Sequence, residues 1–279
     1  GKSVQAQTEI VIDYNSKAFQ SRKLQVRAIG VSVSYIPHTP GQDSAENTKN
    51  LSYQISYNGE VKVKTSDLTL YTGQVSLKDL DGDRLSEVIV SSYSGGAHCC
   101  TNIKIYSWRG DRFSETQTGL LNAGGGIFQD LNGDGKQEFL TSDDAFLYAF
   151  SSYAASSPPS VIYEFRNGKL EDVTRKYPKY LRSRLQEMFK AYKERRNQTD
   201  INGVIAGYVA QKALLGEFKQ GWDFMLANYD RASDWGLARY NNKGKEIGRY
   251  RDFPAALKAL LTQRGYIGAK GRLRESQSK

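Results

Sequence analysis

Residues 79–87 read Asp79-Leu80-Asp81-Gly82-Asp83-Arg84-Leu85-Ser86-Glu87, and residues 130–138 read Asp130-Leu131-Asn132-Gly133-Asp134-Gly135-Lys136-Gln137-Glu138. In both stretches an oxygen-bearing side chain stands at relative positions 1, 3, 5 and 9, with glycine at position 4. Glycine allows the backbone to curl, so that alternate side chains converge on one point. Hard divalent cations such as Ca²⁺ take about six to eight oxygen ligands in flexible geometry. The two stretches therefore predict two calcium-binding loops.

Each loop offers four side-chain ligands and one main-chain carbonyl at position 7. The predicted ligands are Asp79, Asp81, Asp83, Leu85 and Glu87 in the first loop, and Asp130, Asn132, Asp134, Lys136 and Glu138 in the second. An EF-hand is disfavoured because it needs glutamate at position 12, where this chain has Val90 and Thr141. The alternative is a pair of polar turns that bind no ion, since Asp, Asn and Gly are ordinary turn residues. The shared spacing favours the metal.

The acidic loops belong to a longer repeat, because the two stretches stand 51 residues apart and each leads into β-type sequence. Alternating apolar strands joined by a glycine turn follow at 103–113 and at 161–170. A third copy without an acidic loop lies at 53–63. Such strand pairs are β-hairpins, and several short strands in each repeat indicate propeller-like blades.

The two loops and their hairpins resemble the FG-GAP or VCBS repeats found in integrin α-subunits and in many exported bacterial proteins. The resemblance covers about 100 of the 279 residues, and the acidic loops are its specific element. It implies β-sheet blades with Ca²⁺ held in a surface loop by the side chains named above. Arg84 departs from the family pattern, which has glycine there. A closed propeller needs about four or more blades, so we expect an incomplete ring.

Charge and hydrophobic period both change toward the end of the chain. Residues 1–165 contain 14 Lys and Arg against 18 Asp and Glu, whereas residues 166–279 contain 25 against 12. From Pro178 onward apolar residues recur at helical spacing, which predicts helices within 178–192, 200–215, 218–226 and 252–265. We therefore predict an α+β multidomain protein. Antiparallel β repeats fill 1–176, a small basic α-helical module fills 177–269, and residues 270–279 form a disordered tail.

The basic module has two interpretations. Runs of Lys and Arg usually form a solvated helix face. Alternatively, they dock an anionic partner such as an anionic polymer, acidic lipid head groups or an acidic protein surface. The residues concerned are Arg182, Arg184, Lys190, Lys193, Arg195 and Arg196. Specific nucleic-acid binding is disfavoured, because the sequence has no helix-turn-helix, zinc-finger or RNP-like pattern.

The two cysteines of the chain, Cys99 and Cys100, are adjacent. In an oxidising compartment they can pair with each other or with another molecule. One alternative is two reduced thiols on opposite faces of a strand. Another is a metal site with His98, which lacks the Cys-x-x-Cys spacing of zinc sites. For an exported protein we favour the disulfide.

Calcium loops suit a compartment in which calcium reaches millimolar concentration. We therefore expect a periplasmic or extracellular protein whose signal peptide has been removed, since residues 1–7 are polar. No apolar stretch approaches the roughly 18 residues of a membrane-spanning helix.

Catalysis has little support, because His38 and His98 lie in no recognisable nucleophile constellation. The sequence thus predicts a calcium-binding β-repeat protein that acts as a binding or scaffolding module with a protein partner. The alternative is a secreted hydrolase or carbohydrate-active enzyme with a site in an aromatic-rich surface. That surface would include Trp222, Tyr229, Trp235 and Tyr240.

Overall fold

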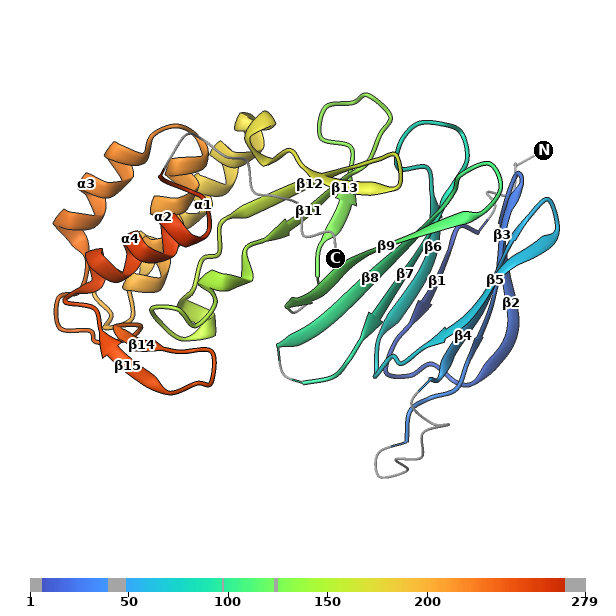
Figure 1. The fold of residues 1–279 in the computed structure, drawn as a ribbon, viewed down its shortest axis with the longest axis horizontal. Helices are drawn as coiled ribbons and strands as arrows, with labels where there is room; N and C mark the ends of the chain where they lie inside the picture. The colour runs from blue at the N-terminus through green and yellow to red at the C-terminus, as the bar shows by residue number, and fades with distance from the viewer. Residues whose placement is uncertain (1–6, 40–48, 97, 123–124, 269–279) are drawn as a thin grey trace. The chain divides into compact units, whose positions relative to one another are not determined.

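The computed structural model describes residues 7–39, 49–96, 98–122 and 125–268 (Figure 1). The predicted disordered tail at 270–279 lies outside these residues. The described chain divides into two compact units. The first consists of the residues up to 139 together with 164–171, and the second consists of 140–163 and the residues from 172 onward. The domain boundary predicted near Tyr177 stays a prediction.

The first unit contains two antiparallel sheets with a common core. One sheet has the strand order β1-β6-β7-β8-β9 and the other has the order β2-β3-β4-β5. Their strands are β1 Glu9–Ile12, β2 Phe19–Val26, β3 Ile29–Tyr35, β4 Leu51–Tyr57, β5 Glu60–Asp67, β6 Gly73–Lys78, β7 Glu87–Tyr93, β8 Cys99–Trp108 and β9 Phe113–Asn122. Along β4 buried and exposed residues alternate, so that its apolar face meets Val75 and Val88 of the other sheet in one buried cluster.

A third sheet has the order β10-β11-β12-β13, with strands at Ile127–Gln129, Glu138–Ser142, Ser160–Arg166 and Lys169–Asp172. The division between the two units passes through this sheet. Counted along the chain, β2–β5, β6–β9 and β10–β13 are three successive runs of four antiparallel strands in sequence order, and β1 adds a fifth strand to the sheet of the second run. This arrangement confirms the predicted blade-like β repeat, and each sheet is open within the described residues.

The three predicted hairpins are present as β4–β5, β8–β9 and β12–β13. Two of them turn at an Asn-Gly pair in which both residues have positive φ. These pairs are Asn58-Gly59 and Asn167-Gly168. Positive φ at both central residues defines the type I′ turn, whose twist matches that of the strands it joins.

Four helices follow, close to the predicted positions. They are α1 Pro178–Arg195, α2 Asn202–Leu214, α3 Phe218–Asn228 and α4 Phe253–Gln263. Proline begins α1, and the Asp252 side chain caps α4 by accepting a hydrogen bond from the Ala255 N–H at 2.9 Å. Together with the β region, they confirm the predicted α+β class. The sequence pattern did not predict a small hairpin between α3 and α4, formed by β14 Ala238–Tyr240 and β15 Glu246–Arg249.

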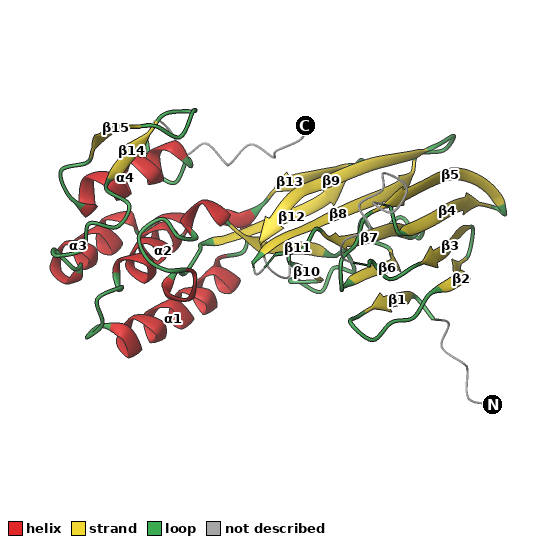
Figure 2. Cartoon of the chain, turned by 90° about the horizontal axis from the view of Figure 1, so that it is seen from below, coloured by secondary structure: helices red, strands yellow, loops and turns green. Residues whose placement is uncertain are grey.

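Helix α2 is the buried centre of the second unit, and α1, α3 and α4 all contact it (Figure 2). Its two glycines allow a loop to approach its backbone. A Cβ at Gly207 would lie 1.5 Å from the Ser157 carbonyl oxygen, and one at Gly203 would lie 1.8 Å from the Ser151 Oγ. No side chain fits at such distances, so the packing requires glycine.

The second unit also contains a buried ion pair. Asp143 accepts hydrogen bonds from the Arg264 guanidinium at 2.9 Å and from the Tyr266 hydroxyl at 3.0 Å. Its carboxylate also caps the 3₁₀ helix Asp144–Phe146. Two further 3₁₀ helices lie at Tyr153–Ala155 and Thr174–Lys176. The Asp143 contacts join the end of β11 to the end of α4.

Candidate metal centre

Both acidic loops connect neighbouring strands of a sheet, as the sequence predicted. The first acidic loop, residues 79–87, joins β6 to β7, and the second acidic loop, residues 130–138, joins β10 to β11. In each loop the glutamate at position 9 is also the first residue of the next strand. Glu87 and Glu138 are each 1% exposed. A carboxylate buried this deeply needs hydrogen-bond donors or a cation beside it.

The same hydrogen bonds hold both loops. The carboxylate at position 1 accepts hydrogen bonds from the N–H groups of positions 4 and 6. Both bonds to Asp79 are 2.9 Å long, and those to Asp130 are 2.8 and 2.9 Å long. The side chain at position 3 accepts from the N–H of position 5, and the carboxylate at position 5 accepts from position 7. The glutamate at position 9 accepts from position 2, at 2.7 Å in the first loop and 2.8 Å in the second. The two loops are therefore copies of one local structure.

Positions 4 and 6 have left-handed backbone in both loops. At position 4 the φ angle is +78° for Gly82 and +74° for Gly133. At position 6 it is +85° for Gly135 and +70° for Arg84. Arg84, which departs from the family pattern, thus adopts the conformation that glycine has in the other loop. A non-glycine residue pays about 1–2 kcal/mol for that conformation.

The side chains of the first acidic loop converge. Carboxylate oxygens of Asp79, Asp81, Asp83 and Glu87 all lie within 4.8 Å of one another. An all-oxygen set of this kind fits a hard cation such as Ca²⁺. Among the residues that the structure describes, the carboxylates of the second acidic loop form no group of three this close. Asn132 supplies an amide in the second loop where the first has a carboxylate.

The electrostatics of the two loops differ accordingly. Burial, with the adjacent Asp83 carboxylate adding to it, raises the pKa of Asp81 to about 6. Burial also raises the pKa of Glu87 to about 8, and the other carboxylates of the loop contribute in the same direction. In the second loop the hydrogen bond from the Gly135 N–H lowers the pKa of Asp130. In the first loop, burial and mutual repulsion therefore oppose the ionised form of Asp81 and Glu87, and a bound cation would favour that form.

The two acidic loops are hydrogen-bonded to each other. The Gln137 N–H of the second loop donates to the Leu80 carbonyl of the first at 3.0 Å. The Lys136 side chain passes over Gly82, where an added Cβ would lie 3.5 Å from the Lys136 Cγ. The spacing of the acids did not predict this contact, nor the N–H groups of Leu80 and Leu131 that hold the buried glutamates.

The predicted main-chain ligands are the carbonyls of Leu85 and Lys136, and these assignments stay predictions. Both residues use their N–H groups to hold the carboxylate at position 5, at 2.8 and 2.9 Å. An N–H directed at Asp83 or Asp134 fixes the orientation of that carboxylate within its loop.

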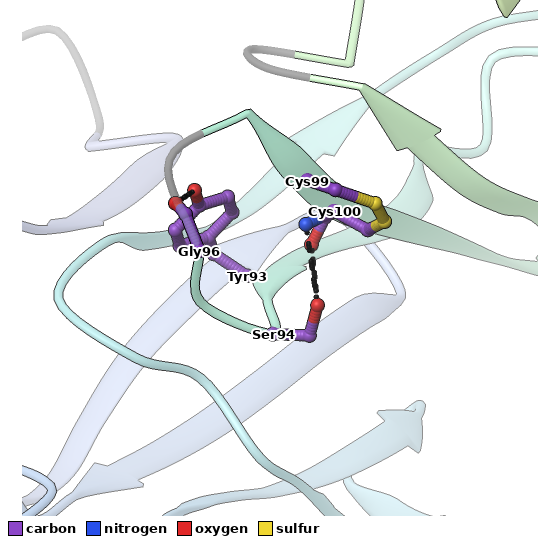
Figure 3. The surroundings of a disulfide bond; sticks show 5 residues. All are labelled: Tyr93, Ser94, Gly96, Cys99 and Cys100. Atoms are coloured by element: carbon purple, nitrogen blue, oxygen red, sulfur yellow. Dashed lines mark hydrogen bonds between the residues drawn. A yellow bond between two sulfur atoms is a disulfide. The ribbon is translucent and has the colours of Figure 1, made fainter.

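Cys99 and Cys100 lie at the start of β8, joined by a cis peptide bond, with their side chains next to each other (Figure 3). The Ser94 hydroxyl accepts from the Cys100 N–H and donates to its carbonyl, at 3.2 Å each. The Tyr93 hydroxyl donates to the Gly96 carbonyl. The pair is thus held by the turn before it, but the arrangement does not establish a disulfide, and the bridge stays a prediction.

The four aromatic residues of the alternative enzyme site differ in their surroundings. Trp222 and Tyr229 are partly buried and pack against the core of the second unit. Trp235 and Tyr240 are exposed. The first two are therefore structural residues, and only the second two present an aromatic surface to solvent.

Most of the named basic residues of α1 have acidic partners. Arg182 binds Glu217 at 2.6 Å, Arg195 binds Asp200 at 3.5 Å, and Lys190 lies 4.0 Å from Glu194. Arg184 pairs with Glu187, and the Lys193 ammonium lies over the Phe189 ring. Arg196 is the C-terminal cap of the helix. Much of the positive charge of α1 is thus offset locally.

Residues 79–141 match the family model of the FG-GAP-like repeat. This segment is thus similar to an FG-GAP-like repeat. This match covers both acidic loops and the four strands β7–β10 between them. Residues 181–265 match the family model of the sll0997 C-terminal domain, which spans all four helices except the first turn of α1.

The chain is similar to the probable thylakoid lumen protein sll0997 of Synechocystis sp. (strain ATCC 27184 / PCC 6803 / Kazusa). The two are 39% identical over 208 residues, which cover 70% of this chain and 61% of that protein. The uncharacterized protein y4bJ of Sinorhizobium fredii (strain NBRC 101917 / NGR234) is 35% identical over 204 residues, 69% of this chain and 32% of that protein. The matched part of this chain thus spans less than two thirds of either relative. No solved structure matches.

Within the described residues, none of the helices combines the length and the apolar composition needed to cross a membrane.

Proposed function

We propose that this chain is an exported calcium-binding β-repeat protein that acts as a binding or scaffolding module. The observation that carries the proposal is the convergence of four carboxylates in the first acidic loop. Two further findings support it: the match to the FG-GAP-like repeat and the hydrogen-bond pattern that the two loops share. The similarity to a protein named for the thylakoid lumen supports an exported location, and we propose the periplasm or the cell exterior.

In this proposal each loop holds one Ca²⁺. The ligands of the first are Asp79, Asp81, Asp83 and Glu87 with the Leu85 carbonyl, and those of the second are Asp130, Asn132, Asp134 and Glu138 with the Lys136 carbonyl. The bound ion neutralises carboxylates that otherwise repel one another, which stiffens the connection between β6 and β7. Its role is structural.

Thermal melts with calcium and with chelator test the metal sites. A ligand that binds only the folded state stabilises it by about 2.7 kcal/mol at a hundredfold excess over its Kd. Asp81→Ala and Asp134→Ala should each lower the melting temperature in calcium and change it little in chelator. Asp111→Ala, at an exposed acid in the turn between β8 and β9, is the matched control. Identical melts of the unchanged chain in calcium and in chelator would show that the loops are plain turns.

The second part of the proposal is that the basic helical module, residues 177–269, docks an anionic partner. Residues 177–269 carry 17 Lys and Arg against 9 Asp and Glu. Such an excess attracts anionic polymers and acidic protein surfaces at long range.

We also propose that Cys99 and Cys100 are bridged in the exported protein, because no other cysteine of the chain is available as a partner. Intact-mass analysis after alkylation of protein purified without reductant measures this directly. A bridge takes up no label until reductant is added. Two labels on the native, exported protein would show that the thiols are free.

A further inference from the structure

The hairpin of β14 and β15 has no buried face. Every residue from 242 to 249 is exposed, and so are Arg239 and Tyr240. Two strands alone are marginally stable in water, and most sheets bury one face against a core. The hairpin, here called the basic hairpin and defined as residues 238–251, lies on the outer side of α4 in both views of the second unit (Figure 1, Figure 2). Its surface is therefore open to a partner.

Large apolar side chains stand on or beside the basic hairpin. Tyr240 is 62% exposed, Ile247 is 57% exposed and Trp235 is 46% exposed. Tyr240 pairs with Glu246, the residue before Ile247, so the two apolar side chains come from adjoining places on the two strands. Single exposed apolar residues are common, but a group of them marks an interaction surface.

Trp235 is held in a fixed orientation while its ring stays exposed. Its indole N–H donates to the Tyr148 carbonyl at 2.8 Å. Tyr148, 49% exposed, has left-handed backbone with a φ of +60°, and its ring packs against Tyr153. A Cβ at Gly236 would lie 2.1 Å from the Ala149 carbonyl oxygen. Strained backbone that fixes an exposed aromatic ring is typical of a binding surface rather than of a core.

The basic hairpin is also strongly positive, with five Lys and Arg against one Glu. Arg249 and Arg251 pair with acids outside it, at 3.1 and 3.2 Å. Lys243 and Lys245, at the tip, have no ion-pair partner among the described residues. This differs from α1, where nearby acids offset most of the basic side chains. Lys243 and Lys245 thus place positive charge without an ion-pair partner beside these exposed apolar residues.

We propose that the basic hairpin docks the chain on an anionic lipid bilayer. This inference rests on the second part of the proposed function, the docking of an anionic partner, and names that partner. Lys243 and Lys245 contact anionic head groups, where each Lys or Arg contributes about 1 kcal/mol. Trp235 and Tyr240 occupy the head-group level that these residue types prefer. Ile247 is removed from water at the boundary with the acyl chains.

Charge complementarity alone fits any polyanion, and Ile247 distinguishes among them. An acidic polysaccharide or a nucleic acid can neutralise the two lysines and stack on the aromatic rings. Neither provides an apolar layer that covers an isoleucine side chain. A bilayer surface provides the anions, the interfacial level and the hydrocarbon together, so the combination of side chains favours lipid.

The test is cosedimentation of the full chain with vesicles of phosphatidylcholine alone and of phosphatidylcholine mixed with phosphatidylglycerol. We expect binding to the mixed vesicles, weakened by salt, and little binding to the neutral ones. Lys243→Glu combined with Lys245→Glu should lower the affinity at least about tenfold. Ile247→Ser should lower it about fivefold. The matched control is Lys23→Glu combined with Lys64→Glu, two exposed lysines of the first unit, which should change it less than about twofold.

Equal binding to neutral and mixed vesicles, no binding to either, or an equal loss in the control variant would overturn the inference. A parallel binding experiment on a sulfated-polysaccharide resin distinguishes failure of bilayer docking from failure of the proposed function. Retention on the resin without vesicle binding overturns bilayer docking and leaves the docking of an anionic partner standing. If the chain binds neither the resin nor the vesicles, both bilayer docking and the docking of an anionic partner are overturned.

Discussion

At the scale of single residues, position 6 of the acidic loops decides how well each loop folds. Arg84 and Gly135 share left-handed backbone, at φ values of +70° and +85°. Glycine adopts it freely, whereas a residue with a Cβ is strained by about 1–2 kcal/mol. Glycine also gains freedom in the unfolded chain, which offsets part of this difference.

Arg84→Gly is therefore expected to stabilise the chain by about 0.5–1 kcal/mol, and Gly135→Ala to destabilise it by a similar amount. Urea unfolding measures both, as a shift in midpoint at unchanged slope. Arg84→Ala removes the guanidinium but keeps the strained backbone, so it should leave the stability nearly unchanged. Equal stabilisation by Ala and Gly would mean that the charge, and not the backbone, is responsible.

At the scale of the elements, close packing against α2 decides the structure of the second unit. Alanine is a better helix former than glycine by about 1 kcal/mol. Gly207→Ala should nevertheless destabilise the chain by about 3 kcal/mol or more, because the new methyl group meets the Ser157 backbone at 1.5 Å.

Gly203→Ala provides the comparison. Its nearest neighbour is the Ser151 side chain rather than backbone. Gly203→Ala should therefore lower the free energy of unfolding less than Gly207→Ala does, and Ser151→Ala should restore part of that loss. Thermal unfolding of the two single variants and of the Gly203→Ala, Ser151→Ala double variant measures the difference. A stabilising Gly207→Ala would contradict the close approach of the loop.

At the scale of the whole molecule, the charge distribution predicts salt-dependent adhesion. The chain has a formal net charge of +9, and residues 1–165 contribute more acids than bases to it. Exposed charges are screened beyond about 8 Å at physiological ionic strength. The full chain should therefore bind a polyanion resin at low salt and elute as salt rises. Reversing Lys23 and Lys64 should alter elution less than reversing Lys243 and Lys245. Passage through the resin at low salt would show that the charge is a solvated surface.

The sequence by itself determined the local structures of this protein. The spacing of acids and glycines predicted two strand-connecting loops, Asn58-Gly59 and Asn167-Gly168 predicted tight turns, and Pro178 with the apolar residues after it predicted α1. All of these depend on interactions between residues close in the chain, where a side chain and the backbone conformation it favours are set together.

Only the tertiary structure decided which of these local features meet. It joined the two acidic loops through the hydrogen bond between Gln137 and Leu80. It also packed Trp222, partly buried, against the core of the second unit while leaving Trp235 exposed, although both are tryptophans near helical segments. These outcomes depend on packing between residues far apart in the sequence. Hydrophobic period shows that a face is buried but does not identify the surface that buries it.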